Sequence, residues 1–459
     1  MATKRAPAAA GPARAGDLSG LAACVQDVAG AARDPDRGPR DPTAFAPLRK
    51  AVARALQGLP PAYQEAMAAP LLATLDRLGP TRFKRLLAAD PDREGAACVL
   101  LDAAQAVLQA GDGDVTDAFQ EVVSDLYDGF LSAEDRRGVK PPDRGVLAPM
   151  VKWGRPEFGP YTLPVDATAS LGARVGVVSL PPGNARHGLC VWAALGHETA
   201  GHDILSADRG LRTELADVVR SALRESGHLS LAGYWADRID ETASDVMGIL
   251  NMGPAAGVGL LATFRGFNLA WGNGARLRSE GDSDDEHPAD VVRGFLAAAT
   301  VRALPFTGAQ AWSDALDRET TLDAQVIRLG RREVTLAEAR ASAAAVARAV
   351  SGTRLRSLEG HGLGEIQTWR DLDEAVVGRL RAALDGRGEI GDAIQRGDYA
   401  AHAVAAAVTA AAGGGDPARL QPRLVTLLAR MHRLNPAWGL LNARHAGDLA
   451  RHRFTSLLG

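Results

Sequence analysis

Two histidines and a glutamate lie close together in the segment GHETAGHD, residues 196–203. Imidazole nitrogens are common zinc ligands, and a glutamate beside a ligating histidine can act as general base toward a zinc-bound water. The familiar zinc-binding helix motif is H-E-x-x-H, in which the two histidines lie four residues apart. Here His197 and His202 lie five residues apart. This spacing raises the question of how both rings could reach one metal ion.

A local change of helix geometry would bring the two rings together. Each residue of an α-helix turns by about 100°, so positions five apart differ by about 140° around the axis. A one-residue π-type bulge absorbs the additional residue and returns both rings to one side. Gly201, directly before His202, is the residue best able to adopt the required backbone. We therefore expect a bulged helix with His197 and His202 as ligands and Glu198 as general base.

A third ligand is expected from a separate helix, because a hydrolytic zinc site combines three protein ligands with one position for water. The segment DETASD, residues 240–245, supplies a carboxylate at Glu241. Asp245 lies four residues later on the same helix face, where it can accept a hydrogen bond from the ring N–H of a ligating histidine. The alternative is that these are solvated side chains on helix surfaces, with one histidine capping a helix.

The segments HETAGH and DETASD resemble the paired H-E-x-x-G-H and E-E-x-x-A-D/E signatures of dipeptidyl-peptidase III, a family of zinc exopeptidases with the same one-residue expansion. The resemblance implies zinc ligands at His197, His202 and Glu241, a catalytic glutamate at Glu198, and signature positions at Gly201 and Asp245. Asp240 and Ser244 differ from the glutamate and alanine usual in the family. The similarity covers about residues 190–250, so it implies a metal site and a mainly helical catalytic lobe but does not extend to dipeptide release.

A peptidase also needs a group that stabilises the oxyanion. Tyr234 lies two helical turns before Glu241, and His287 precedes Pro288 at a helix start. Both are candidates for this role, and the alternatives are core packing for Tyr234 and helix capping for His287.

Three arginines on the following helices could hold a substrate carboxylate, as an exopeptidase requires. The alternative for each of them is an ion pair within the chain. These residues are Arg265, Arg293 and Arg302.

The elements that must position these residues are mostly helical, because alanine and leucine dominate and apolar residues recur at three- and four-residue spacing. We expect an unstructured tail over 1–20, a helical region over 21–140, the zinc-binding region over 141–330 and a further helical region over 331–459. The fold class is therefore mainly α, with a zincin-like core. The segment RVGVVSL, residues 174–180, is expected to be an edge strand before the histidine helix, either pairing with a peptide substrate or serving only as a sheet element.

The composition excludes several classes of protein. At 459 residues, 46% hydrophobic and 23% charged, the chain is long enough for two or three globular domains. The net charge of −3, with both signs interspersed, gives no basis for binding nucleic acid or a membrane surface. The three cysteines are far apart, which argues against a disulfide framework and a cysteine-type zinc cluster. No signal-peptide core or membrane span is evident, so we expect a cytoplasmic protein.

Together these patterns predict a zinc metallopeptidase that cleaves peptides or small proteins. Two other functions stay open: a non-haem iron enzyme with a two-histidine, one-carboxylate triad, and a helical scaffold whose metal site is catalytically inactive.

Overall fold

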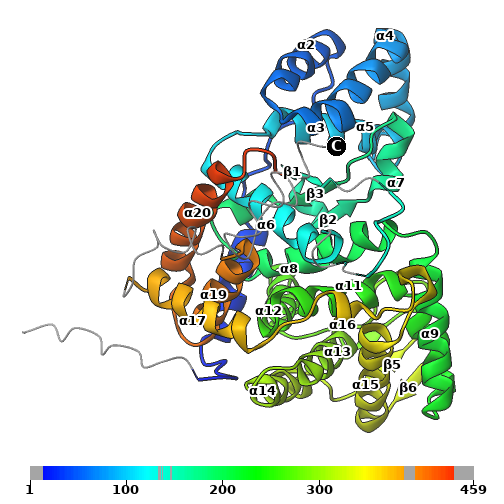
Figure 1. Cartoon of the computed structure of the whole chain (residues 1–459), viewed down its shortest axis with the longest axis vertical. Helices are drawn as coiled ribbons and strands as arrows, with labels where there is room; N and C mark the ends of the chain where they lie inside the picture. Colours follow the sequence, from blue (N-terminus) through cyan, green and yellow to red (C-terminus); the bar gives the residue numbers. More distant parts are fainter. Residues whose placement is uncertain (1–13, 133–135, 137, 145–146, 387–397, 439–459) are drawn as a thin grey trace, which may run out of the picture.

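The computed structural model describes residues 14–132, 136, 138–144, 147–386 and 398–438. These residues form a mainly helical structure, as the sequence predicts, with two small three-stranded sheets (Figure 1). Residues 1–13 of the expected tail lie outside the described residues, whereas residues 14–20 lie against the folded chain. There the backbone N–H of Gly20 donates to the carbonyl of Ala412, at 2.6 Å.

The N-terminal helices form two groups. Three of them pack around an apolar cluster that includes Leu48, Met67 and Phe83, at the top of Figure 1. These three helices are α2 (Phe45–Ala55), α4 (Ala69–Ala89) and α5 (Ala96–Gln109). The short helix α3 (Pro61–Tyr63) adds Tyr63 to the same cluster. Two further helices, α1 (Leu21–Ala32) and α6 (Asp114–Leu131), belong to the main core of the molecule.

A small sheet separates this N-terminal cluster from the main core. It has the order β1-β3-β2, formed by β1 (Met150–Trp153), β2 (Tyr161–Leu163) and β3 (Val177–Leu180). Strand β3 pairs in parallel with β1 and antiparallel with β2. Val177 joins the N-terminal cluster and Val178 joins the main core, because successive side chains of a strand face opposite sides.

The strand expected near residues 174–180 therefore exists, but it is the central strand and not an edge strand. Both of its edges are occupied by backbone hydrogen bonds to β1 and β2. The edge strand nearest the histidine segment is β2, which contacts it directly. Pairing of a peptide with this sheet beside the histidine segment would therefore use the edge strand β2, since β3 is paired on both sides.

The middle of the chain forms the helices of the main core. They are α8 (Val191–His197), α9 (Leu211–Glu225), α10 (Leu229–Ala236), α11 (Ile239–Met252), α12 (Pro254–Ala270), α13 (Asp290–Ala303), α14 (Ala309–Leu322) and α15 (Leu336–Gly352), whereas the short helix α7 (Val165–Thr168) lies against α5 and β2. Helix α11 packs against α8, α12 and α13. This central position places α11 at the junction of the elements that carry the predicted site residues.

The remaining elements are a second small sheet and the C-terminal helices. The second sheet contains β4 (Glu280–Gly281), β5 (Ile327–Leu329) and β6 (Arg332–Val334). The C-terminal helices are α16 (Leu363–Ile366), α17 (Asp371–Leu384), α19 (Ala400–Ala412) and α20 (Pro417–Leu434). Helix α19 packs on α12, and α20 packs on α6. Among the helices described, none has the length and apolar character needed to cross a membrane.

Candidate metal centre

The helix that carries the two histidines changes geometry at the predicted place. Helix α8 ends at His197 and continues without interruption as a π-helical turn, Glu198–Asp203. The wider turn brings the rings of His197 and His202 together, with their centroids 4.8 Å apart and their planes nearly perpendicular. The Nε2 atoms of the two rings lie 3.1 Å from each other. The expected distortion is therefore present.

Gly201 is required for a different reason from the one expected. It is not among the glycines with left-handed backbone, so the π-helical turn does not depend on its conformational freedom. Instead, a Cβ atom at this position would lie 1.9 Å from the Ser244 hydroxyl oxygen on α11. The absence of a side chain at residue 201 thus allows the histidine helix and α11 to approach closely.

Helix α11 places its acidic residues against both histidines. The Glu241 carboxylate lies 3.3 Å from His197 Nε2 through Oε2 and 3.4 Å from His202 Nε2 through Oε1. These three residues form the group of side chains in the described chain that could hold a metal ion. The sequence predicted all three of them.

Carboxylates on the far side of both rings fix their orientation. Asp245 Oδ1 lies 2.8 Å from His197 Nδ1, and Asp240 Oδ2 lies 3.1 Å from His202 Nδ1. An ionised carboxylate only accepts hydrogen bonds, so each Nδ1 carries the proton and each Nε2 presents a lone pair. Asp245 was predicted for this role. Asp240 was not, although its position beside Glu241 on the first turn of α11 was a usable signal.

The donor set fits a zinc ion. Two lone pairs facing each other at 3.1 Å repel unless a cation or a proton lies between them. Two ligands about 2.1 Å from a tetrahedral zinc lie about 3.4 Å from each other, close to the separations found among these three side chains. Glu241 Oε2 is buried and accepts no well-aligned hydrogen bond from the described residues, although His197 Nε2 and Arg293 Nη1 lie 3.3 and 3.2 Å away. Two imidazoles and a carboxylate are a common ligand set of hydrolytic zinc sites.

Without a metal ion, the negative charges around the site favour an additional proton on the His197 ring. Burial opposes a charge on His197, but the carboxylates of Glu241 and Asp245 outweigh it and raise the pKa of the ring to about 10. Burial also opposes ionisation of Glu241, yet His197 and Arg293 hold its pKa well below the usual value. The site is therefore built to bind positive charge.

Glu198 lies beside the ligands and is held by a residue that the sequence did not reveal. Its side chain is buried, and its charge acts on the ring of His202. The hydroxyl oxygen of Thr162, on β2, lies 3.0 Å from Glu198 Oε2 and 2.9 Å from its main-chain carbonyl oxygen. No motif marked Thr162, because its role depends on the edge position of β2.

The two oxyanion candidates occupy different places. Tyr234 accepts a hydrogen bond from the backbone N–H of Ala289, at 2.9 Å, and its ring packs on the Arg238 guanidinium. His287 is 56% exposed, and its Nε2 lies 3.5 Å from Glu241 Oε1. Only His287 thus has a described contact with one of the three ligands.

The three arginines considered for a substrate carboxylate are paired within the chain. Arg265 contacts Glu319 and Asp323, and Arg302 contacts Asp314. Arg293 contacts Asp245 and Glu241. Each of the three arginines therefore forms ion pairs within the chain, which was the alternative to binding a substrate carboxylate.

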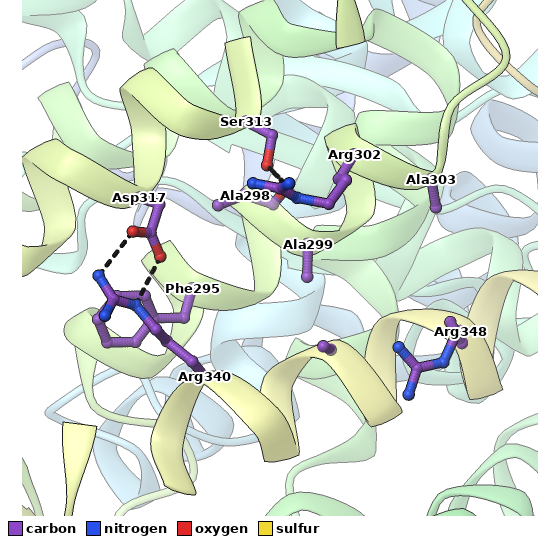
Figure 2. Close-up of a pocket in the computed structure, with 10 residues that line it drawn as sticks. Phe295, Ala298, Ala299, Arg302, Ala303, Ser313, Asp317, Arg340 and Arg348 are labelled. Atoms are coloured by element: carbon purple, nitrogen blue, oxygen red, sulfur yellow. Dashed lines mark hydrogen bonds and ion pairs between the residues drawn. The ribbon is translucent and has the colours of Figure 1, made fainter. Parts of the chain in front are cut away.

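A separate cavity of about 400 Å³ lies between α13, α14 and α15 (Figure 2). Its floor is apolar, with Phe295 and several alanines. Arg340 forms two hydrogen bonds with Asp317, and Arg302 donates to Ser313. Because these lining groups satisfy one another and none of the three ligands lines the cavity, the candidate site remains at the histidines.

No protein-family model, curated protein or solved structure matches this chain.

Proposed function

We propose that this chain is a zinc-dependent hydrolase, and specifically a metallopeptidase with a zincin-like arrangement of its active-site helix. The observation that carries this proposal is the pair of Nε2 atoms 3.1 Å apart, next to the carboxylate of Glu241. A glutamate directly follows the first of these histidines, as general-base catalysis at a zinc site requires. His197, His202 and Glu241 would hold the zinc ion, which when bound polarises the substrate carbonyl and acidifies its water.

The other groups act on the substrate and on protons. Glu198 accepts the proton of the attacking water and passes it to the leaving amine. The Thr162 hydroxyl, 3.0 Å from Glu198 Oε2, holds this carboxylate in place. We assign stabilisation of the oxyanion to His287, because it is exposed and reaches Glu241, whereas the Tyr234 hydroxyl is held by Ala289. The free edge of β2 offers backbone groups to an extended peptide.

A non-haem iron site remains the second candidate, since two histidines and one carboxylate also form its facial triad. In such a site, Glu198 would have no necessary role. Purified protein with its metal removed separates the two candidates: hydrolysis is restored by zinc but not by iron(II) if the chain is a zinc peptidase.

The decisive experiment is the substitution Glu198→Gln. A mixture of tryptic peptides from casein is incubated with zinc-loaded protein, and its cleavage is followed by mass spectrometry. We expect Glu198→Gln to keep its zinc but to lose hydrolysis by about a hundredfold or more, because the general base is absent. Glu225→Gln, at an exposed position of α9, should match the wild type in both measurements.

Hydrolysis by Glu198→Gln at the wild-type rate would contradict the catalytic role of Glu198. If the wild-type protein retains zinc but cleaves no peptide, the result would support the alternative of a scaffold with a catalytically inactive metal site.

A further inference from the structure

A buried guanidinium lies directly behind the ligands. Arg293, on α13, is 4% exposed and stacks over the ring of Phe264, with 4.6 Å between the guanidinium carbon and the ring centroid. Its Nε and Nη2 atoms each lie 2.8 Å from an oxygen of Asp245. Its Nη1 atom lies 3.2 Å from Glu241 Oε2. One cation therefore contacts both the carboxylate that orients His197 and the carboxylate that would bind the metal.

The charges around the site explain why such a cation is needed. Asp245 is fully buried, and the side chain of Glu241 is 10% exposed. Two buried carboxylates without a positive partner would repel each other and would favour protonation or an open structure. Arg293 satisfies Asp245 through a bidentate contact and reaches Glu241 with its remaining nitrogen, so the ligand set keeps its geometry without a metal.

The same charge acts against the metal. A guanidinium is positive at any accessible pH and lies within a few ångströms of the position that the three donors surround. It therefore repels a divalent ion, in contrast to the carboxylates that orient the histidines.

We propose that Arg293 is a positioning residue that serves as an internal cation of the metal centre. It holds Glu241 and Asp245 in place when no metal is bound, and it weakens metal binding through charge repulsion. This inference rests on the proposed metal site but not on the proposed hydrolysis.

The test compares Arg293→Met, Arg293→Lys and the control Arg265→Met. Arg265 is also a buried arginine bound to two carboxylates, Glu319 and Asp323, but it does not contact the ligands. Zinc affinity is measured by competition with a chelating dye, and Tm is measured with and without zinc. These readouts do not depend on turnover.

We expect Arg293→Met to lower Tm of the metal-free protein, to gain more Tm from zinc than the wild type, and to bind zinc on the order of tenfold more tightly. Arg293→Lys keeps the charge and should bind zinc like the wild type. Arg265→Met should lower Tm equally with and without zinc and leave the affinity unchanged. Unchanged or weaker zinc binding by Arg293→Met would overturn the proposal, because a merely structural arginine predicts that result.

If Arg293→Met does not fold, the double variant Asp245→Asn with Arg293→Met keeps the buried charges balanced. It should bind zinc more tightly than Asp245→Asn alone, and equal or weaker binding would refute the internal cation. A wild-type protein that binds zinc but cleaves no peptide would end the peptidase proposal and leave this one standing. A wild-type protein that does not bind zinc would end both.

Discussion

Among the residues that the structure describes, Thr162 contacts the Glu198 carboxylate through its hydroxyl. We expect Thr162→Val, which removes the hydroxyl at nearly constant volume, to lower kcat for peptide cleavage about ten- to hundredfold, because a hydrogen bond to a charged group is lost. Zinc affinity should not change, since Thr162 contacts none of the three ligands in the described structure. The measurement is kcat beside the zinc Kd.

Thr162→Ser is the matched control, because it keeps the hydroxyl and removes only a methyl group. It should retain most of the activity. If Thr162→Ser lost as much activity as Thr162→Val, packing of the methyl group would be the cause, and the positioning role of the hydroxyl would be wrong.

At the scale of residues, the sequence reveals the site residues that belong to a motif. It does not reveal residues from distant segments that reach the site only in the folded chain. Glu241 and Asp245 were predictable because their four-residue spacing places them on one helix face, and His197 and His202 because a one-residue bulge brings both rings to one side. Thr162 comes from an edge strand with no sequence signature. Arg293 could be recognised as a candidate, but its burial against Glu241 depends on how α13 packs on α11.

The contact between the π-helical turn and α11 sets the distance between the histidines and Glu241. A side chain at residue 201 would overlap Ser244, whose Cα lies 2.4 Å from the position that a Cβ atom of residue 201 would take. We expect Gly201→Ala to lower the free energy of unfolding by about 1–3 kcal/mol through overpacking. It should also displace Glu241 and weaken zinc binding. Chemical denaturation and zinc competition check both effects.

Gly233→Ala on α10 provides the comparison, because the nearest heavy atom to its added Cβ would be Asp237 Oδ2, at 3.8 Å. This substitution should stabilise the helix by up to about 1 kcal/mol and leave zinc binding unchanged. A Gly201→Ala variant that is as stable as Gly233→Ala and binds zinc normally would show that the close approach of the helices is not required.

A single carboxylate caps the start of α5. Asp90 accepts hydrogen bonds from the backbone N–H groups of Glu94, Gly95, Ala97 and Cys98. Desolvation opposes its ionisation, but these four donors hold the pKa of Asp90 below its usual value. Its contribution to stability is therefore complete above the unfolded pKa, near 3.8, and is lost as the pH falls through the lower, folded value.

We accordingly expect Asp90→Ala to destabilise the protein more at pH 7 than at pH 3, as measured by urea denaturation at both values. Asp92→Ala, at an exposed position nearby, should show no such difference. An equal loss at both pH values would mean that the charge of Asp90 does not contribute.

The elements themselves were predictable to different degrees. The helices follow from apolar periodicity, and the strand around Val177–Leu180 follows from its β-branched residues. The central position of that strand was not predictable, because it depends on pairing with β1 and β2, which are short and lie on either side of it in space. The π-helical turn was predictable only because His197 and His202 must lie on the same side of the helix to bind one metal ion.

At the scale of the whole molecule, the candidate metal centre lies inside a large apolar core. The ligand-bearing helices α8 and α11 pack with α12 and α13 in one large apolar cluster (Figure 1). The sheet joins this cluster to the N-terminal one, since its two faces contribute to different clusters. Apolar burial on this scale is the dominant favourable term in folding, so we expect the fold to form without a bound ion.

Removal of zinc should therefore lower the thermal stability of the protein without unfolding it at 25 °C. A ligand that binds only the folded state adds stability by mass action, about 4 kcal/mol when its free concentration is a thousandfold above Kd. We expect protein treated with EDTA to keep its helical circular dichroism at 25 °C and to melt several degrees below the zinc-loaded form. Re-addition of zinc should restore Tm, and magnesium, which prefers oxygen ligands, should not. Loss of helical signal on zinc removal would instead show that the ion is a structural requirement, as in proteins too small to fold without their metal.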